Sequence, residues 1–216
     1  MSKERRSFQR QQEETRREAL IHAALDLMAK GGPRAATVRA IADHAGITPG
    51  LIRHYFNSKE DLTRAAYYAL MQRMTQEAQS AADAADTPVR ALASVISTSL
   101  RPPVMDGTRI RLWAGFLHMV HNDPDMREVH EATYLAYRNL LQSLIEKLPG
   151  KSDPVTARSL AIACNAVIDG LWLEGGALPA SFTDGEIERI GKDAIAAILG
   201  IDPIEFTEMS QQGPTP

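Results

Sequence analysis

Apolar residues recur along most of this chain at the spacing of one face of an α-helix. Between residues 13 and 30 they follow i, i+4, i+7 and i+8, at Leu20, Ala24, Leu27 and Met28. Gly31 and Gly32 then end this first helix. No segment combines the strict alternation of a strand with flanking turn residues. The pattern therefore predicts an all-α protein of about nine helices.

Helix starts along the chain are marked by capping residues. A Thr or Asp directly before Pro is typical of an N-cap and the first helical residue, as in Thr48-Pro49, Thr87-Pro88, Asp123-Pro124 and Asp153-Pro154. Two more pairs, Ser58 with Asp61 and Thr183 with Glu186, have the spacing of a capping box. The chain then ends in a polar tail, residues 204–216, which we expect to be disordered.

Two short helices between Thr37 and Phe56 form the most specific pattern in the sequence. Gly46 permits a tight turn between them. Helical spacing turns five apolar residues inward, namely Ile41, Ala42, Ile47, Ile52 and Phe56. It turns four residues of the second helix outward, namely Pro49, Gly50, Arg53 and His54. A short helix with exposed N-terminal residues fits the DNA major groove, so we predict a helix-turn-helix, with an ordinary corner between two bundle helices as the alternative.

The charge of the chain is divided unevenly along its length. Residues 1–60 hold eleven Lys and Arg against seven Asp and Glu, a net charge of +4. Residues 61–216 hold thirteen against twenty, a net charge of -7. This asymmetry is expected of a chain that binds a polyanion through its N-terminal part alone. A chance difference in surface charge between the two parts is the alternative.

The run from His54 to Leu62 contains a Tyr-Phe-x-x-Lys-Glu-x-Leu motif. Together with residues 37–42 and 46–50, this motif resembles the DNA-binding domain of TetR-type regulators. Four further segments resemble the choline-responsive BetI repressors of the glycine-betaine pathway, namely residues 50–56, 112–116, 121–124 and 168–173.

The TetR resemblance implies DNA contacts for eight residues. Three of them would bind phosphates, namely Thr37, Tyr55 and Lys59. The other five would lie at base edges or the flanking backbone, namely Thr48, Pro49, Gly50, Arg53 and His54. Helical pitch also exposes Arg39, which we expect to contact a phosphate. Arg53 departs from the aromatic residue that many members carry, and either a guanine or a phosphate suits its guanidinium.

The N-terminal arm that precedes the first helix is basic. It carries Lys3, Arg5, Arg6 and Arg10. We expect a flexible arm that follows the DNA backbone or minor groove, or else a frayed terminus.

Aromatic residues in the remainder of the chain stand on three predicted helices. They are Trp113 with Phe116, Tyr134 with Tyr137, and Trp172. With Asp169 or Glu174 nearby, they could line one pocket and hold a quaternary ammonium ion by charge and cation–π contacts. Aromatic residues at helical spacing are also ordinary core residues, and choline or betaine aldehyde as the effector is implied only by the BetI resemblance.

The last two long helices, expected at residues 153–174 and 183–199, are strongly apolar. Their stripes are Ala163, Val167, Gly170 and Leu171, then Ile187, Ile190, Ala194 and Ile198. A two-turn recognition helix reads only a few base pairs, so a homodimer on palindromic DNA is expected. The family resemblance places these two helices in a four-helix interface, while packing within one subunit is the alternative.

Several function classes are disfavoured by composition and motifs. No run approaches 18 apolar residues and no signal-peptide pattern is present, so no membrane association is predicted. The single cysteine, Cys164, excludes an intrachain disulfide and favours a cytoplasmic location. His118 and His121 stand at i, i+3 without a His-Glu-x-x-His pattern, and no nucleophile elbow occurs, so we predict no metal, cofactor or enzyme activity.

The sequence thus predicts a DNA-binding domain in residues 1–60 and a helical sensing and dimerisation domain in residues 61–203. The expected function is a repressor that binds operator DNA as a dimer and is released by a small molecule. A regulator of efflux or catabolic genes that senses another cation or an apolar metabolite is the alternative. A helical enzyme or an adaptor without DNA binding is a third class.

Overall fold

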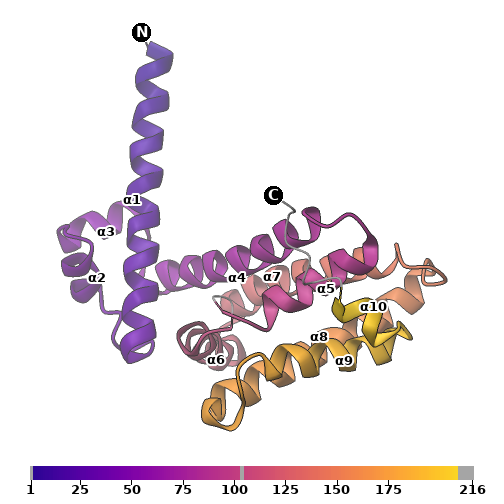
Figure 1. The fold of residues 1–216 in the computed structure, drawn as a ribbon. Coiled ribbons are helices and arrows are strands. Elements are labelled where there is room, and N and C mark those ends of the chain that lie inside the picture. Colours follow the sequence, from indigo (N-terminus) through magenta and orange to yellow (C-terminus); the bar gives the residue numbers. More distant parts are fainter. Residues whose placement is uncertain (1, 103–104, 209–216) are drawn as a thin grey trace, which may run out of the picture. The chain divides into compact units, whose positions relative to one another are not determined.

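The computed structural model describes residues 2–102 and 105–208, with the side chains of residues 2–6, 9, 10, 205, 207 and 208 outside the description. Within these ranges the chain is helical and contains no strand (Figure 1). The elements are α1 (Ser2–Gly31), α2 (Val38–His44), α3 (Pro49–Tyr55), α4 (Lys59–Asp83), α5 (Pro88–Ser99), α6 (Gly107–Asn122), α7 (Pro124–Ile145), α8 (Pro154–Ala177), η1 (Pro179–Ser181), α9 (Glu186–Leu199) and α10 (Pro203–Glu208). The predicted all-α class is confirmed.

The chain divides into two structural units that alternate along the sequence. The first consists of Met1–Leu70 and Arg111–His130, and the second of Met71–Ile110 and Glu131–Pro216. Each passage from one unit to the other falls inside a helix, in α4, α6 and α7. Because no linker marks these passages, the sequence suggested instead one contiguous boundary at residue 60.

The first unit is built on the predicted helix-turn-helix. Ile41, Ala42, Ile52 and Phe56 are buried as expected, while Ile47 is only half-buried. Gly46 adopts a left-handed φ of 67°, and the Ile47 amide donates to the Ala42 carbonyl oxygen at 2.9 Å. These features close α2 and redirect the chain into α3. Packing of α2 against both α1 and α3 completes this unit's core.

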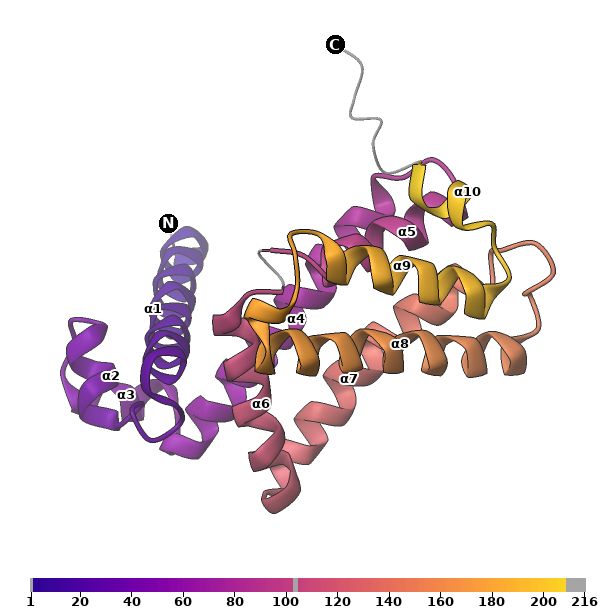
Figure 2. The same cartoon turned by 60° about the horizontal axis from the view of Figure 1, so that its bottom comes forward.

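The second unit centres on α5, whose Leu92, Val95 and Ile96 are fully buried. α9 contacts α5, α8 and α10, and Figure 2 shows α8 and α9 running side by side. A side chain at Gly191 of α9 would overlap Leu100, so the glycine permits the close approach of α9 to the end of α5. The second unit is thus a helical layer held by α5, α8 and α9.

Several of the predicted capping residues cap their helices, whereas Thr48 makes no side-chain capping bond and Gly185 rather than Thr183 precedes α9. The Asp61 amide donates to Ser58 Oγ at 3.0 Å, and Asp61 Oδ2 accepts from the Asn57 amide at 3.1 Å. Thr87 and Asp153 accept from the amides of Arg90 and Thr156, at 3.2 and 2.9 Å. These bonds satisfy amides that have no partner within the helix.

Both ends of the described chain differ from expectation. α1 begins at Ser2 rather than near Glu13, so the residues of the expected arm continue a helix. The basic side chains of that arm, Lys3, Arg5, Arg6 and Arg10, lie outside the described side chains. At the other end, residues 203–208 form α10 where a disordered tail was expected from residue 204, because Phe206 is fully buried and α10 packs on α5 and α9. Residues 209–216 lie outside the description.

Candidate DNA-binding surface and effector site

The residues predicted to contact DNA lie mostly on the surface of the first unit. Seven are exposed, namely Thr37, Arg39, Thr48, Pro49, Gly50, Arg53 and His54. Tyr55 and Lys59 are half-buried, at the end of α3 and the start of α4. The outward face of α3 predicted from helical spacing is therefore open.

Burial of its inner side and a contact from α1 fix the orientation of α3. Ile52 and Phe56 are buried on its inner side. The Arg17 guanidinium of α1 lies 5.1 Å from the centre of the Phe56 ring, within reach of a cation–π contact. The rings of His54 and Tyr55 meet edge-on, with centroids 5.1 Å apart. The inner side of α3 is thus packed against the rest of the first unit, while its outer face is exposed.

The exposed polar groups of the helix-turn-helix suit a polyanion. Thr37 Oγ1 accepts from the Ala40 amide at 3.1 Å, which leaves its hydroxyl proton to donate elsewhere. Thr48 makes no capping bond with its side chain. An added Cβ at Gly50 would meet nothing within 4 Å, so packing within the chain does not require glycine there. Without a side chain at Gly50, the backbone of α3 is open at this position.

A buried cluster in the first unit joins α4 to α6 and α7. Tyr67 is fully buried, its hydroxyl lies 2.6 Å from His130 Nδ1, and its ring stacks on Phe116 with centroids 4.6 Å apart. Arg64 of α4 lies 3.3 Å from Asp125 of α7. This cluster was not predicted from the sequence, although Tyr67 lies three residues before Leu70, at the spacing of one helix face.

The six predicted effector residues are divided between the two units. Trp113 and Phe116 belong to the first unit, where they are buried at 6% and 1% exposure. Tyr134, Tyr137, Asp169 and Trp172 belong to the second. The core role that was left open for the aromatic residues therefore fits Phe116.

In the second unit, Asp169 lies among hydrogen-bond donors on α7 and α8. The Tyr134 hydroxyl donates to Asp169 Oδ2. The Asn165 side-chain amide donates to the same oxygen at 3.1 Å and to the Tyr134 hydroxyl oxygen at 2.5 Å. Asn165 was not predicted; its position four residues before Asp169 on a buried helix face was the available signal.

A second group of hydrogen bonds links α5 to the same two helices. The Tyr137 hydroxyl lies 2.6 Å from Ser99 Oγ, which also donates to the Val95 carbonyl oxygen at 2.8 Å. The Trp172 indole donates to the Ser99 carbonyl oxygen at 2.8 Å. Ser99, the last residue of α5, thus ties α7 to α8. Nothing in its sequence context had indicated this role.

Burial shifts the pKa of the ionisable groups in this region. Burial raises the pKa of Asp169, against the hydrogen bond from Tyr134, which lowers it. Burial also raises the pKa of the Tyr134 and Tyr137 hydroxyls, and it raises the pKa of the neighbouring Cys164 thiol to about 12. Among the described residues, no basic side chain forms an ion pair with Asp169. An added cation would therefore favour the charged carboxylate.

An apolar row runs along the exposed side of α8. We call it the α8 row; its members are Val155, Ser159, Ile162, Ala166, Gly170, Leu173 and Ala177. Val155 and Leu173 are 75% and 53% exposed. Within the described chain α8 is also the one helix long and apolar enough to cross a membrane, by length and composition alone. On α9, Ile187, Ile190, Ala194 and Ile198 are half-buried.

Two family models match the chain. Residues 20–66 match the bacterial regulatory proteins of the tetR family. Residues 88–200 match the C-terminal domain of BetI-type transcriptional repressors. Together the two matches cover the helix-turn-helix and most of the second unit.

Curated relatives match over most of their length. The HTH-type transcriptional regulator BetI of Stenotrophomonas maltophilia (strain R551-3) is 31% identical over 180 residues, 82% of this chain and 90% of the relative. The BetI regulator of Rhizobium meliloti (strain 1021) is 30% identical over 161 residues, 74% of this chain and 78% of the relative.

Solved structures share the fold. A transcriptional regulator from Pseudomonas aeruginosa PAO1 is 29% identical with a TM-score of 0.76, and the match covers 89% of this chain and 94% of that one. A regulator from Saccharomonospora viridis, solved in complex with choline, has a TM-score of 0.67 and covers 85% of this chain and 95% of its own. At 17% identity the second shows likeness of fold alone.

Proposed function

The chain belongs to the TetR family of bacterial regulators, with a BetI-type C-terminal domain, and from this premise we propose that it represses transcription as an effector-released homodimer. It is a DNA-binding regulator rather than an enzyme. We further propose a palindromic operator, a cytoplasmic location and a quaternary ammonium effector such as choline or betaine aldehyde. The observation that carries the effector class is the half-buried Asp169 carboxylate, which lacks an ion-pair partner among the described residues.

DNA binding by the outer face of α3 is supported by its exposure. Arg53 and His54 project from a helix whose inner side is fixed by Ile52 and Phe56. The phosphates on either side would be bound by Thr37, Arg39, Tyr55 and Lys59. If each subunit neutralises about three or four phosphates, the dimer has a log–log salt slope of roughly -5 to -7.

Dimerisation through α8 and α9 is supported by the α8 row. Seven small or apolar residues, each three or four positions after the one before, lie on one side of α8 and carry no charge. A contiguous exposed apolar surface of this kind marks an interaction site. Two copies of α8 and α9 facing one another would make a four-helix interface, as in helix bundles.

The effector site is proposed between α7 and α8, around Asp169. A quaternary ammonium ion has no N–H group, so it attracts a carboxylate by charge without competing for the hydrogen bonds that Tyr134 and Asn165 donate. The aromatic rings of Tyr134, Tyr137 and Trp172 supply cation–π partners. The methyl groups of choline can pack on these rings, whereas the ammonium group of ethanolamine has only N–H groups, so the arrangement favours choline over ethanolamine.

Release follows from a shift between two conformers of the dimer. The DNA-binding conformer holds its two copies of α3 about 34–36 Å apart, one turn of DNA. An effector that binds the other conformer more tightly shifts the dimer toward that conformer and so lowers its affinity for the operator. The size of the loss is limited by the ratio of the effector's affinities for the two conformers. A 100-fold loss of affinity needs a coupling of about 2.7 kcal/mol, which is ordinary for allosteric proteins.

Isothermal titration with choline and ethanolamine tests the effector site. We expect choline to bind the wild type more tightly than ethanolamine, and Asp169→Asn to remove most of the choline affinity. Asp83→Asn, which neutralises an exposed carboxylate of the second unit, is the matched control and should bind like the wild type. If neither ligand binds, or both bind Asp169→Asn as they bind the wild type, another cation or an apolar metabolite is the effector.

A further inference from the structure

α1 extends well beyond the helix-turn-helix that it supports. The match to the TetR family begins at residue 20, and Leu20 is the first buried residue among the described side chains. Residues 2–19, which we call the α1 extension, continue the helix for about 27 Å before that point, at 1.5 Å per residue. Figures 1 and 2 both show this part of α1 running past α2 and α3.

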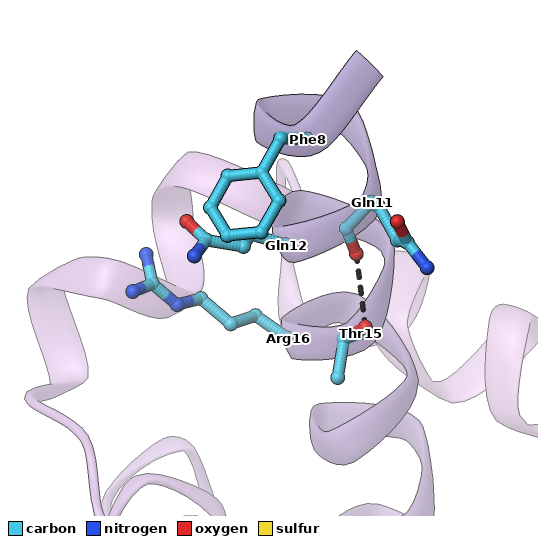
Figure 3. A pocket seen from close by; sticks show the side chains of 5 residues that line it. All are labelled: Phe8, Gln11, Gln12, Thr15 and Arg16. Atoms are coloured by element: carbon cyan, nitrogen blue, oxygen red, sulfur yellow. Dashed lines mark hydrogen bonds between the residues drawn. The ribbon is translucent and has the colours of Figure 1, made fainter. Parts of the chain in front are cut away.

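One side of the α1 extension carries a row of exposed side chains. Phe8, Gln12 and Arg16, which we call the α1 ridge, stand at i, i+4 and i+8 and project from the same side of the helix (Figure 3). With Gln11 and Thr15 they border a shallow surface pocket. No acidic residue lines this pocket, and the Phe8 side chain is 61% exposed. The surface offers amide and guanidinium donors beside an apolar ring.

Half of the net positive charge of residues 1–60 belongs to the α1 extension. Residues 2–19 hold six Lys and Arg against four Glu, a net charge of +2, and residues 20–60 hold five against three, also +2. Within the extension the positive charge is concentrated at the start, because residues 1–12 hold four Lys and Arg against one Glu. The α1 extension can therefore add as much net attraction to DNA as the helix-turn-helix, since phosphates dominate affinity.

A largely polar helix that covers no core gains little from packing. Such helices are marginal in water, because most helical stability in proteins comes from an apolar face that packs on a neighbour. Residues 11–16 are all exposed. Charge complementarity and continuity with the helix-turn-helix both indicate a polyanion as the partner of this helix.

We propose that the α1 ridge is a second DNA-binding surface, which contacts the phosphodiester backbone outside the bases read by α3. Arg16 and Gln12 donate to phosphate oxygens, and Phe8 packs on the deoxyribose beside them. A reach of about 27 Å corresponds to about eight base pairs at 3.4 Å each. The inference rests on the proposed binding of DNA by the dimer, with one α1 ridge in each subunit.

The salt dependence of DNA binding by the full-length chain tests this proposal. Fluorescence anisotropy is measured over a series of salt concentrations, with the duplex upstream of the chain's own gene and with a duplex of unrelated sequence. Arg16→Gln should weaken binding to both duplexes and make the log–log slope shallower by about 1.8, or 0.9 for each of two lost contacts. Gln12→Arg adds a charge to the α1 ridge and should steepen the slope by a similar amount.

A matched control separates the α1 ridge from the overall charge of the chain. Lys147→Gln removes an exposed cation from the second unit and should leave the slope unchanged. Circular dichroism verifies that each variant keeps the helix content of the wild type. If Arg16→Gln disturbs α1, Gln12→Arg still tests the proposal. It is expected to raise the affinity for DNA, and misfolding would not do that.

Two results would overturn the proposal. If the wild type binds DNA while both substitutions leave the slope at the wild-type value, the α1 ridge does not contact DNA. If the substitutions instead change the mass of the assembly in sedimentation, the α1 ridge binds another protein chain. Absence of DNA binding by the wild type itself would contradict the proposed function rather than the role of the α1 ridge alone.

Discussion

Gly170 allows the proposed dimer interface to be tested with a single methyl group. It lies inside α8 and belongs to the α8 row. Within the chain, an added Cβ at Gly170 would meet nothing within 4 Å. Glycine inside a helix costs roughly 0.5–1 kcal/mol relative to alanine, so the fold of one chain gains nothing from it. We infer that Gly170 serves contact with a second chain.

The structure gives Gly170→Ala opposite effects in the monomer and in the dimer. In one chain, the helix gains about 0.5–1 kcal/mol. At a close-packed interface, the extra methyl group costs typically 1–3 kcal/mol. We therefore expect the dimer dissociation constant to rise by roughly 5- to 150-fold.

Sedimentation equilibrium at several protein concentrations measures that constant. Gly115→Ala is the matched control, because Gly115 also lies inside a helix and its added Cβ would meet only the Pro33 ring, at an ordinary 3.7 Å. We expect Gly115→Ala to raise stability without affecting dissociation. A Gly170→Ala protein that dissociates like the wild type and melts at a higher temperature would refute the proposed interface.

Three further outcomes are expected. Lys59→Ala should weaken binding to all DNA sequences alike and make the salt slope of the dimer shallower by about 1.8, as anisotropy titrations would show; an unchanged slope contradicts a phosphate contact. Tyr137→Phe removes the hydroxyl that lies 2.6 Å from Ser99 Oγ and should cost about 1 kcal/mol of unfolding free energy in urea, whereas an unaltered midpoint contradicts a stabilising bond. Since burial raises the pKa of Asp169, the folded chain keeps that proton longer than the unfolded chain. Stability of the effector-free protein should fall as pH rises from about 4 through the raised pKa, and Asp169→Asn should remove that contribution, which urea titrations across pH would detect.

Local signals in the sequence predicted the helix-turn-helix and the helix starts. Gly46 and the Ser58–Asp61 pair act through bonds between neighbouring residues, so their geometry is encoded within a few positions. The end of the chain was harder to predict. Phe206 is buried only because α5 and α9 offer it a surface, and that surface is assembled from residues a hundred positions apart.

The sequence placed six candidate effector residues in one pocket, whereas the structure divides them between the two units. Tyr134, Tyr137, Asp169 and Trp172 all fall in the second unit, while Trp113 and Phe116 fall in the first. Spacing along the sequence shows which residues share a helix face, but not which faces meet. Asn165 and Ser99 were missed for the same reason, since each takes its role from partners on another helix.

The most direct test of the account is the affinity of the dimer for its operator with and without choline. We predict that saturating choline raises the apparent Kd for the DNA upstream of the chain's own gene by up to about 100-fold, a coupling of about 2.7 kcal/mol. By reciprocity, operator DNA should weaken choline binding by the same factor. If calorimetry shows that choline binds while the operator Kd stays at its choline-free value, choline is not the releasing effector and the account is contradicted.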